Sequence, residues 1–80
     1  MKYKYHTERR DYKYGSGERF ASCDEAMRHV AKVRNELLTK LALAGYYKGV
    51  RRITVRNVKR KNLVRIKITI AYPVNLLRDE

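Results

Sequence analysis

The second half of the chain concentrates cations without acids. Between residues 37 and 78 there are eleven lysines and arginines and no aspartate or glutamate, whereas residues 1–36 hold nine basic and six acidic residues. Ammonium and guanidinium groups gathered in this way bind phosphate oxygens, and the phosphate backbone of DNA or RNA is the commonest anion that they meet. The pattern therefore favours nucleic-acid binding, with DNA and RNA equally compatible. The candidate binding residues are Lys2, Lys4, Tyr46, Tyr47, Lys48, Arg51, Arg52, Arg56, Lys59, Arg60, Lys61, Arg65 and Lys67.

Tyrosines are the second group that could contribute to such an interface. The chain has seven tyrosines and no tryptophan. Tyr46 and Tyr47 directly precede the basic segment, where exposed rings could stack on unpaired bases. Tyr3 and Tyr5 alternate with two lysines, and two arrangements are open. Either the tyrosines complete the core and the lysines lie on an uncovered sheet face, or the tyrosines lie on that face and stack bases.

Residues that could catalyse a reaction or hold a metal are scattered. Cys23 is the single cysteine, which excludes a disulfide within the chain and a cysteine-rich zinc site. His29 follows Glu25 by four residues, a spacing that suits surface hydrogen bonding on a helix. The segment Gly15-Ser16-Gly17 lacks the lysine and the spacing of a phosphate-binding loop. The sequence therefore predicts no enzyme, no metal site and no cofactor.

A long amphipathic helix is the first element that would position the cations. Ser22 and Glu25 match the capping-box pattern S-x-x-E, and Gly45 is a typical helix stop. Apolar residues recur at helical spacing between them, which predicts a helix to about residue 44 with one face packed on a sheet. The predicted apolar stripe consists of Cys23, Ala26, Val30, Val33, Leu37, Leu41 and Ala44.

Two strands follow the helix, joined by a turn at residues 59–62. Apolar residues alternate with polar ones in both strands, so one face of each would pack against the helix. The inward residues are predicted to be Ile53, Val55, Val64, Ile66, Ile68, Ile70 and Tyr72. Arg52, Arg56, Arg65 and Lys67 would then share the uncovered face, and Lys59, Arg60 and Lys61 would protrude at the hairpin tip.

The N-terminal segment also alternates, but its tyrosines change parity between Tyr5 and Tyr12. We therefore expect either a hairpin with a turn at residues 7–10 or a strand with a bulge. Phe20 would anchor a further short strand at residues 18–21. The predicted order is β(β)-α-β-β, an α+β fold in which a small antiparallel sheet carries one long amphipathic helix. Residues 1–80 would form a single compact domain.

Two other classes of function fit the same features. A small inhibitor of the phage or mobile-element type could dock its cations on an acidic surface of a nucleic-acid-handling protein complex. A self-associating structural protein could use the apolar residues beside the main helical stripe, whereas a homodimer is compatible with every one of these functions. Those residues are Ala31, Leu38, Ala42 and Leu43. No segment approaches the roughly 20 apolar residues of a membrane span, so we expect a cytoplasmic protein without a membrane partner.

Overall fold

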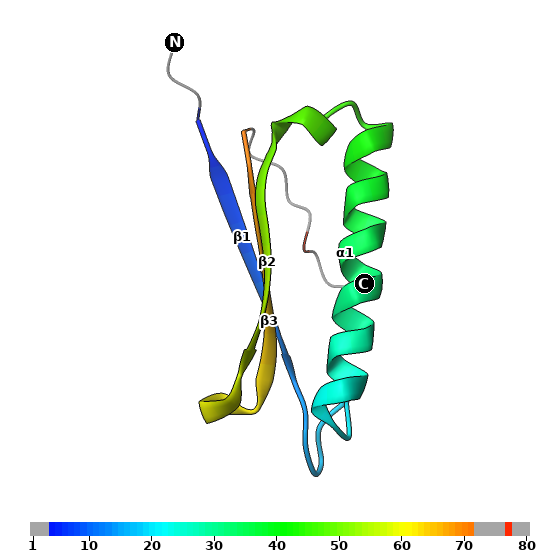
Figure 1. Cartoon of the computed structure of the whole chain (residues 1–80), viewed down its shortest axis with the longest axis vertical. Coiled ribbons are helices and arrows are strands. Elements are labelled where there is room, and N and C mark those ends of the chain that lie inside the picture. Colours follow the sequence, from blue (N-terminus) through cyan, green and yellow to red (C-terminus); the bar gives the residue numbers. More distant parts are fainter. Residues whose placement is uncertain (1–3, 72–76, 78–80) are drawn as a thin grey trace.

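A three-stranded antiparallel sheet with one helix along one face forms the computed structural model, which describes residues 4–71 and residue 77 (Figure 1). β3 is the central strand and pairs antiparallel with both of its neighbours, in the order β1-β3-β2. This arrangement confirms the predicted α+β fold. The elements are β1 (His6–Lys13), α1 (Cys23–Leu43), η1 (Tyr47–Gly49), β2 (Val50–Val58), η2 (Lys59–Lys61) and β3 (Leu63–Ile70), where η marks a short 3-10 helix.

The ends of α1 lie where the sequence places them. Ser22 Oγ accepts a hydrogen bond from the Glu25 N–H at 3.3 Å, and the Glu25 carboxylate reaches back to the backbone before the cap. At the other end the Tyr46 N–H donates to the Leu41 carbonyl at 2.8 Å, as in a Schellman motif. Gly45 adopts a φ of +81°, which a side chain would oppose. Within the described residues, no helix is long and apolar enough to cross a membrane.

The core lies between α1 and the inner face of the sheet. Even-numbered residues of β3 point towards α1, and Ile66 and Ile68 are almost completely buried there. Val30 and Leu41 of α1 belong to the same core cluster. Removal of these apolar side chains from water is the main force that holds the helix on the sheet. Tyr72 and Tyr3 lie outside the described residues.

A bulge at the start of β2 determines which of its side chains reach each face. Val50 and Arg52 pair with consecutive residues of β3, so Arg51 is the inserted residue. An insertion of one residue reverses the facing of everything that follows it. Val50 and Ile53 therefore both pack against the core, although three positions separate them. Two arginines, Arg51 and Arg52, therefore lie at the bulge.

The N-terminal segment forms one strand, and the predicted hairpin or bulge is wrong. Residues 7–10 lie inside β1, which pairs with β3 without a break from His6 to Lys13. The tyrosine parity has another cause: Tyr12 is in the core with 8% of its surface exposed, whereas Tyr5 precedes the strand and is 55% exposed.

Polar side chains on the inner face of β1 bind the backbone of Leu77. The buried carboxylate of Glu8 accepts a hydrogen bond from the Leu77 N–H at 2.8 Å, and Arg10 donates to the Leu77 carbonyl oxygen at 3.2 Å. The other carboxylate oxygen of Glu8 lies 3.0 Å from His6 Nε2. Leu77 also packs against the core. These contacts explain why β1 has charged residues where the other strands have isoleucine and valine.

Phe20 anchors the connection from β1 to α1 without forming a strand. The predicted strand at residues 18–21 is reduced to one bridge between Tyr14 and Phe20. The Phe20 ring lies 6.2 Å from the Tyr12 ring and 5.0 Å from the His29 ring, measured between centroids. His29 thus packs against the rings of both Tyr12 and Phe20.

Candidate nucleic-acid interface

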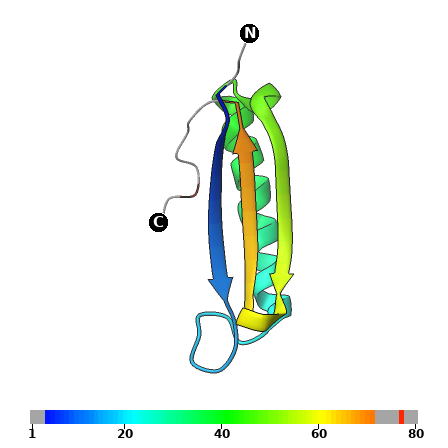
Figure 2. The same cartoon turned by 90° about the vertical axis from the view of Figure 1, so that its left-hand side faces the viewer.

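The sheet face opposite α1 gathers side chains from all three strands, and Figure 2 views it with α1 behind the sheet. Antiparallel register aligns them in rows: Thr7 and Arg52 flank Thr69, and Arg9 and Thr54 flank Lys67. We name this surface the open face. Its polar residues are Thr7, Arg9, Asp11 and Lys13 of β1, Arg65, Lys67 and Thr69 of β3, and Arg52, Thr54 and Arg56 of β2.

Cations on the open face lie close to one another. Alternate residues of a strand are about 7 Å apart, and neighbouring strands are about 4.8 Å apart. Arg9 lies directly opposite Lys67, and Arg56 directly opposite Arg65. Like charges in such cross-strand positions repel one another and lower the stability of the sheet. Anions bound between them would remove this repulsion, so the arrangement suits a polyanionic ligand.

Arg65 is bound to Asp11, which the sequence analysis did not foresee. Its Nε donates to Asp11 Oδ1 at 2.8 Å, and a terminal nitrogen donates to Oδ2 at 3.3 Å. The hydrogen bond from Arg65 lowers the pKa of Asp11, and the same bond raises the pKa of Arg65. Both groups are therefore charged at neutral pH. Arg65 is thus half-buried and paired, and the exposed cations of the open face are Arg9, Lys13, Arg52, Arg56 and Lys67.

Replacement of Asp11 by asparagine should strengthen binding of a polyanion. The change removes the one acid among the open-face residues and releases Arg65 for a phosphate. A further phosphate contact makes the slope of log K against log salt steeper by about 0.7 for a single strand. The measurement is a salt series of oligonucleotide titrations on D11N and wild type.

The control for that comparison is Glu36→Gln on the exposed surface of α1, which changes net charge by the same amount. An equal gain in affinity from E36Q would show that only net charge matters and that Asp11 has no local role.

The same ion pair makes a pH prediction. Because the pKa of Asp11 is lowered in the folded chain, the pair stabilises the fold at pH values above the ordinary aspartate pKa of 3.8. This contribution should disappear as pH falls through the lower folded value. In D11N the free energy of unfolding should therefore lose less between pH 5 and about pH 3 than in wild type.

The hairpin tip carries the predicted basic turn. Lys59, Arg60 and Lys61 form η2 and are exposed, and Asn62 closes the turn in the left-handed conformation with φ of 51°. The Tyr14 N–H donates to the Asn62 carbonyl oxygen at 3.0 Å, which fixes the tip to the end of β1. The tip therefore extends the cations of the open face beyond the end of the sheet.

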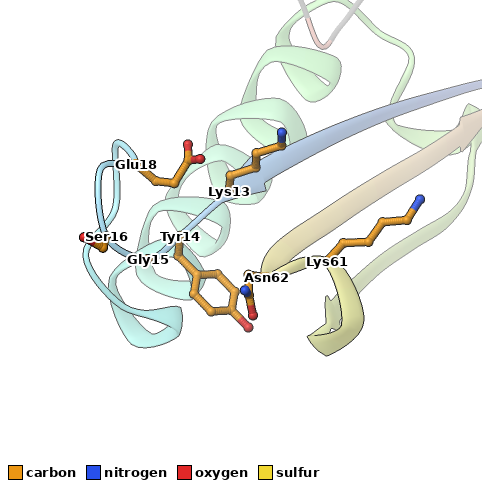
Figure 3. Close-up of a pocket in the computed structure, with 7 residues that line it drawn as sticks. All are labelled: Lys13, Tyr14, Gly15, Ser16, Glu18, Lys61 and Asn62. Atoms are coloured by element: carbon orange, nitrogen blue, oxygen red, sulfur yellow. The ribbon is translucent and has the colours of Figure 1, made fainter.

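A shallow pocket of about 240 Å³ lies between this tip and the loop after β1. Figure 3 shows Lys13 and Lys61 extending from neighbouring segments beside it. Glu18 also lines the pocket, so its carboxylate offsets part of the lysine charge. Burial and the adjacent Cys23 raise the pKa of Tyr14, whose hydroxyl donates to Asn57 Oδ1 at 2.9 Å. The contacts here indicate a structural junction beside the basic tip.

Tyr46 and Tyr47, which the sequence placed in the interface, do not lie on the open face. Tyr46 and Tyr47 belong to the connection between α1 and β2, with 39% and 57% of their surfaces exposed. Lys48 lies in the same connection and is exposed. These three residues border the end of the sheet near Arg51, away from the rows of the open face.

For Tyr5 the sequence left two arrangements open, one in the core and one on the uncovered sheet face. Tyr5 directly precedes β1 with the odd-numbered parity of the open-face residues, and the Arg51 guanidinium lies 5.6 Å from its ring centre. Lys4 is exposed but has the parity of the inner face, so it does not join the rows. Lys2 lies outside the described residues.

The apolar residues beside the helical stripe are mainly on the surface. Leu43 is 86% exposed, Ala31 and Ala42 are exposed, and Leu38 is half-buried. Across residues 4–71 and 77, no group of three or more histidine, cysteine or acidic side chains is arranged to hold a metal ion.

Comparison with known proteins gives no further assignment. No protein-family model, curated protein sequence or solved structure matches this chain.

Proposed function

We propose that this chain is a non-enzymatic nucleic-acid-binding protein that holds the phosphate backbone on its open face and basic hairpin tip. The observation that carries the proposal is the antiparallel register. It brings exposed cations from both edge strands and the central strand onto one side of the sheet, where cations lie opposite each other.

The opposite side of the molecule provides the contrast. Exposed residues of α1 include Arg28 and Lys32 together with Asp24, Glu25 and Glu36. A surface that serves only solubility mixes signs in this way. The open face instead has five exposed cations and one acid, and Arg65 already neutralises that acid. Segregation of charge to one face supports binding to an extended anion.

Binding would follow from release of the counterions that surround a nucleic acid. Each phosphate neutralised by a lysine or arginine adds about 0.7 to the salt slope for a single strand and about 0.9 for a duplex. Arginines can also donate two parallel hydrogen bonds to one phosphate, and Arg9, Arg52 and Arg56 are exposed for this. The exposed open-face cations alone would then give a slope of about −3.5 on a single strand.

A fluorescence-anisotropy titration tests the proposal. Single-stranded and duplex DNA and RNA of about 12 nucleotides are titrated with the wild-type chain across a salt series. We expect saturable binding with a slope of −3 or steeper, of the order set by the phosphate contacts. Binding that does not saturate, or a salt slope much shallower than −3, would refute the proposal. That result would favour the acidic protein surface as the partner.

A further inference from the structure

An exposed tyrosine and an arginine lie together at the end of the open face opposite the hairpin tip. Tyr5 has 55% of its surface exposed, and the Arg51 guanidinium carbon is 5.6 Å from its ring centre. Arg51 occupies this place because the bulge in β2 inserts it between two paired residues. The two side chains come from opposite edges of the sheet and meet across the end of β3.

The chemistry of this pair suits a flat, unpaired ring system. A nucleobase stacks on the face of an aromatic side chain, and the plane of a guanidinium group stacks in the same way. In a duplex both faces of a base are covered by its neighbours. Only an unpaired base, in a single strand or a loop, can lie on Tyr5.

The neighbouring row continues the site towards the phosphate-binding cations. Thr7 and Thr69 stand beside Tyr5 with their hydroxyl oxygens 2.9 Å apart, and Arg52 completes the row. Each hydroxyl has hydrogen-bonding capacity beyond this one contact, which suits a sugar or a base edge. The next rows supply Arg9, Lys67 and Arg56.

We propose that Tyr5 and Arg51 form a base-stacking platform that makes this protein prefer single-stranded nucleic acid over duplex. This inference rests on the proposed function, since the cations of the open face hold the strand that delivers the base. The nucleic-acid strand runs along the sheet. One of its bases lies on Tyr5, and its phosphates contact the cations in the other rows of the open face.

Tyr5→Leu is the variant that tests the platform. Leucine keeps an apolar side chain at an exposed position and removes the aromatic face. We expect affinity for a single strand to fall about tenfold, the usual size of one base-stacking contact, while affinity for a duplex changes less than twofold. The salt slope should stay the same because no charge is lost.

Met27→Ala is the control, since it removes an exposed apolar side chain from α1, on the other side of the sheet from the platform. It should leave both affinities unchanged. An equal loss on single strand and duplex in Y5L, or no loss on either, overturns the platform while leaving phosphate binding intact. If the wild-type chain shows no salt-dependent binding to any oligonucleotide, the proposed function itself has failed.

A second measurement reports stacking directly. The chain has no tryptophan, so Tyr5→Trp introduces a single tryptophan at the platform, whose emission can be excited apart from that of the tyrosines. We expect its emission to be quenched by a single strand and to change little with a duplex. Equal quenching by the two forms would contradict the preference for unpaired bases.

Discussion

Simultaneous replacement of four open-face cations by glutamine should lower affinity for a short oligonucleotide at least about 100-fold at 50 mM salt and make the salt slope shallower by about 3. The four residues are Arg9, Arg52, Arg56 and Lys67. All are exposed, so their loss removes phosphate contacts without opening the core. The variant also removes the repulsion between Arg9 and Lys67, so its thermal midpoint should not fall. Anisotropy titrations and thermal melts measure the two quantities.

The matched control removes the same amount of charge from the other side of the molecule. Arg28, Lys32, Arg34 and Lys40 are exposed on α1, and their replacement by glutamine also lowers the net charge of +12 by four. We expect at most a fewfold loss of affinity, from the weaker overall field. Similar losses in the two variants would mean that the chain attracts polyanions by net charge alone, without a defined face.

The second large effect concerns stability. Ile66→Ala should lower the free energy of unfolding by about 2–5 kcal/mol, because the change leaves a cavity at the centre of the core. Ile66 is completely buried on the central strand, where it faces α1. A domain of this size has a total stability of only about 4–12 kcal/mol, so the variant should lose a large fraction of it and unfold at a lower urea concentration. Urea unfolding followed by circular dichroism gives the number.

Two milder substitutions serve as comparisons for Ile66→Ala. Ile66→Val removes one methylene group and should cost about 0.5–1.5 kcal/mol. Thr54 is exposed on an edge strand, so Thr54→Ala should change the free energy of unfolding by about 0.5 kcal/mol or less. If T54A lowered the free energy of unfolding as much as I66A does, the assignment of the Ile66 face as the buried face of the sheet would be wrong.

Local sequence patterns were sufficient to predict α1 and the hairpin of β2 and β3. The capping box at Ser22 and Glu25 and the stop at Gly45 are signals that act within one turn of the chain, and they set the bounds of α1. The turn closed by Asn62 is local in the same sense. Alternation in β3 was clear because that strand is central and has an almost entirely apolar inner face.

Features that depend on distant parts of the chain were missed. Asp11 binds Arg65 across 54 positions, and no local pattern reports such a pair. Glu8 and Arg10 lie on the inner face of β1 and bind the backbone of Leu77, so no apolar residue marked this part of the strand in the sequence. A signal for the bulge was present, since Val50 and Ile53 are both apolar but differ in parity.

The candidate site followed from the sequence only in part. Arg52, Arg56 and Lys67 lie on the predicted face, but Arg9 and Lys13 were not foreseen, because the placement of β1 beside β3 fixes their position. The contact of Tyr5 with Arg51 was also not foreseen, because it joins segments 46 positions apart. The role of these residues in binding stays a prediction.

Nuclear magnetic resonance of the arginine side chains tests the central claim most directly. In a chain of 80 residues the Nε–Hε signals can be assigned and followed while a single-stranded oligonucleotide is added. We predict that the signals of Arg9, Arg52 and Arg56 shift and saturate together, whereas those of Arg28 and Arg34 on α1 do not move. Shifts confined to the helix arginines, or no shifts at saturating oligonucleotide, would contradict the assignment of the open face as the nucleic-acid interface.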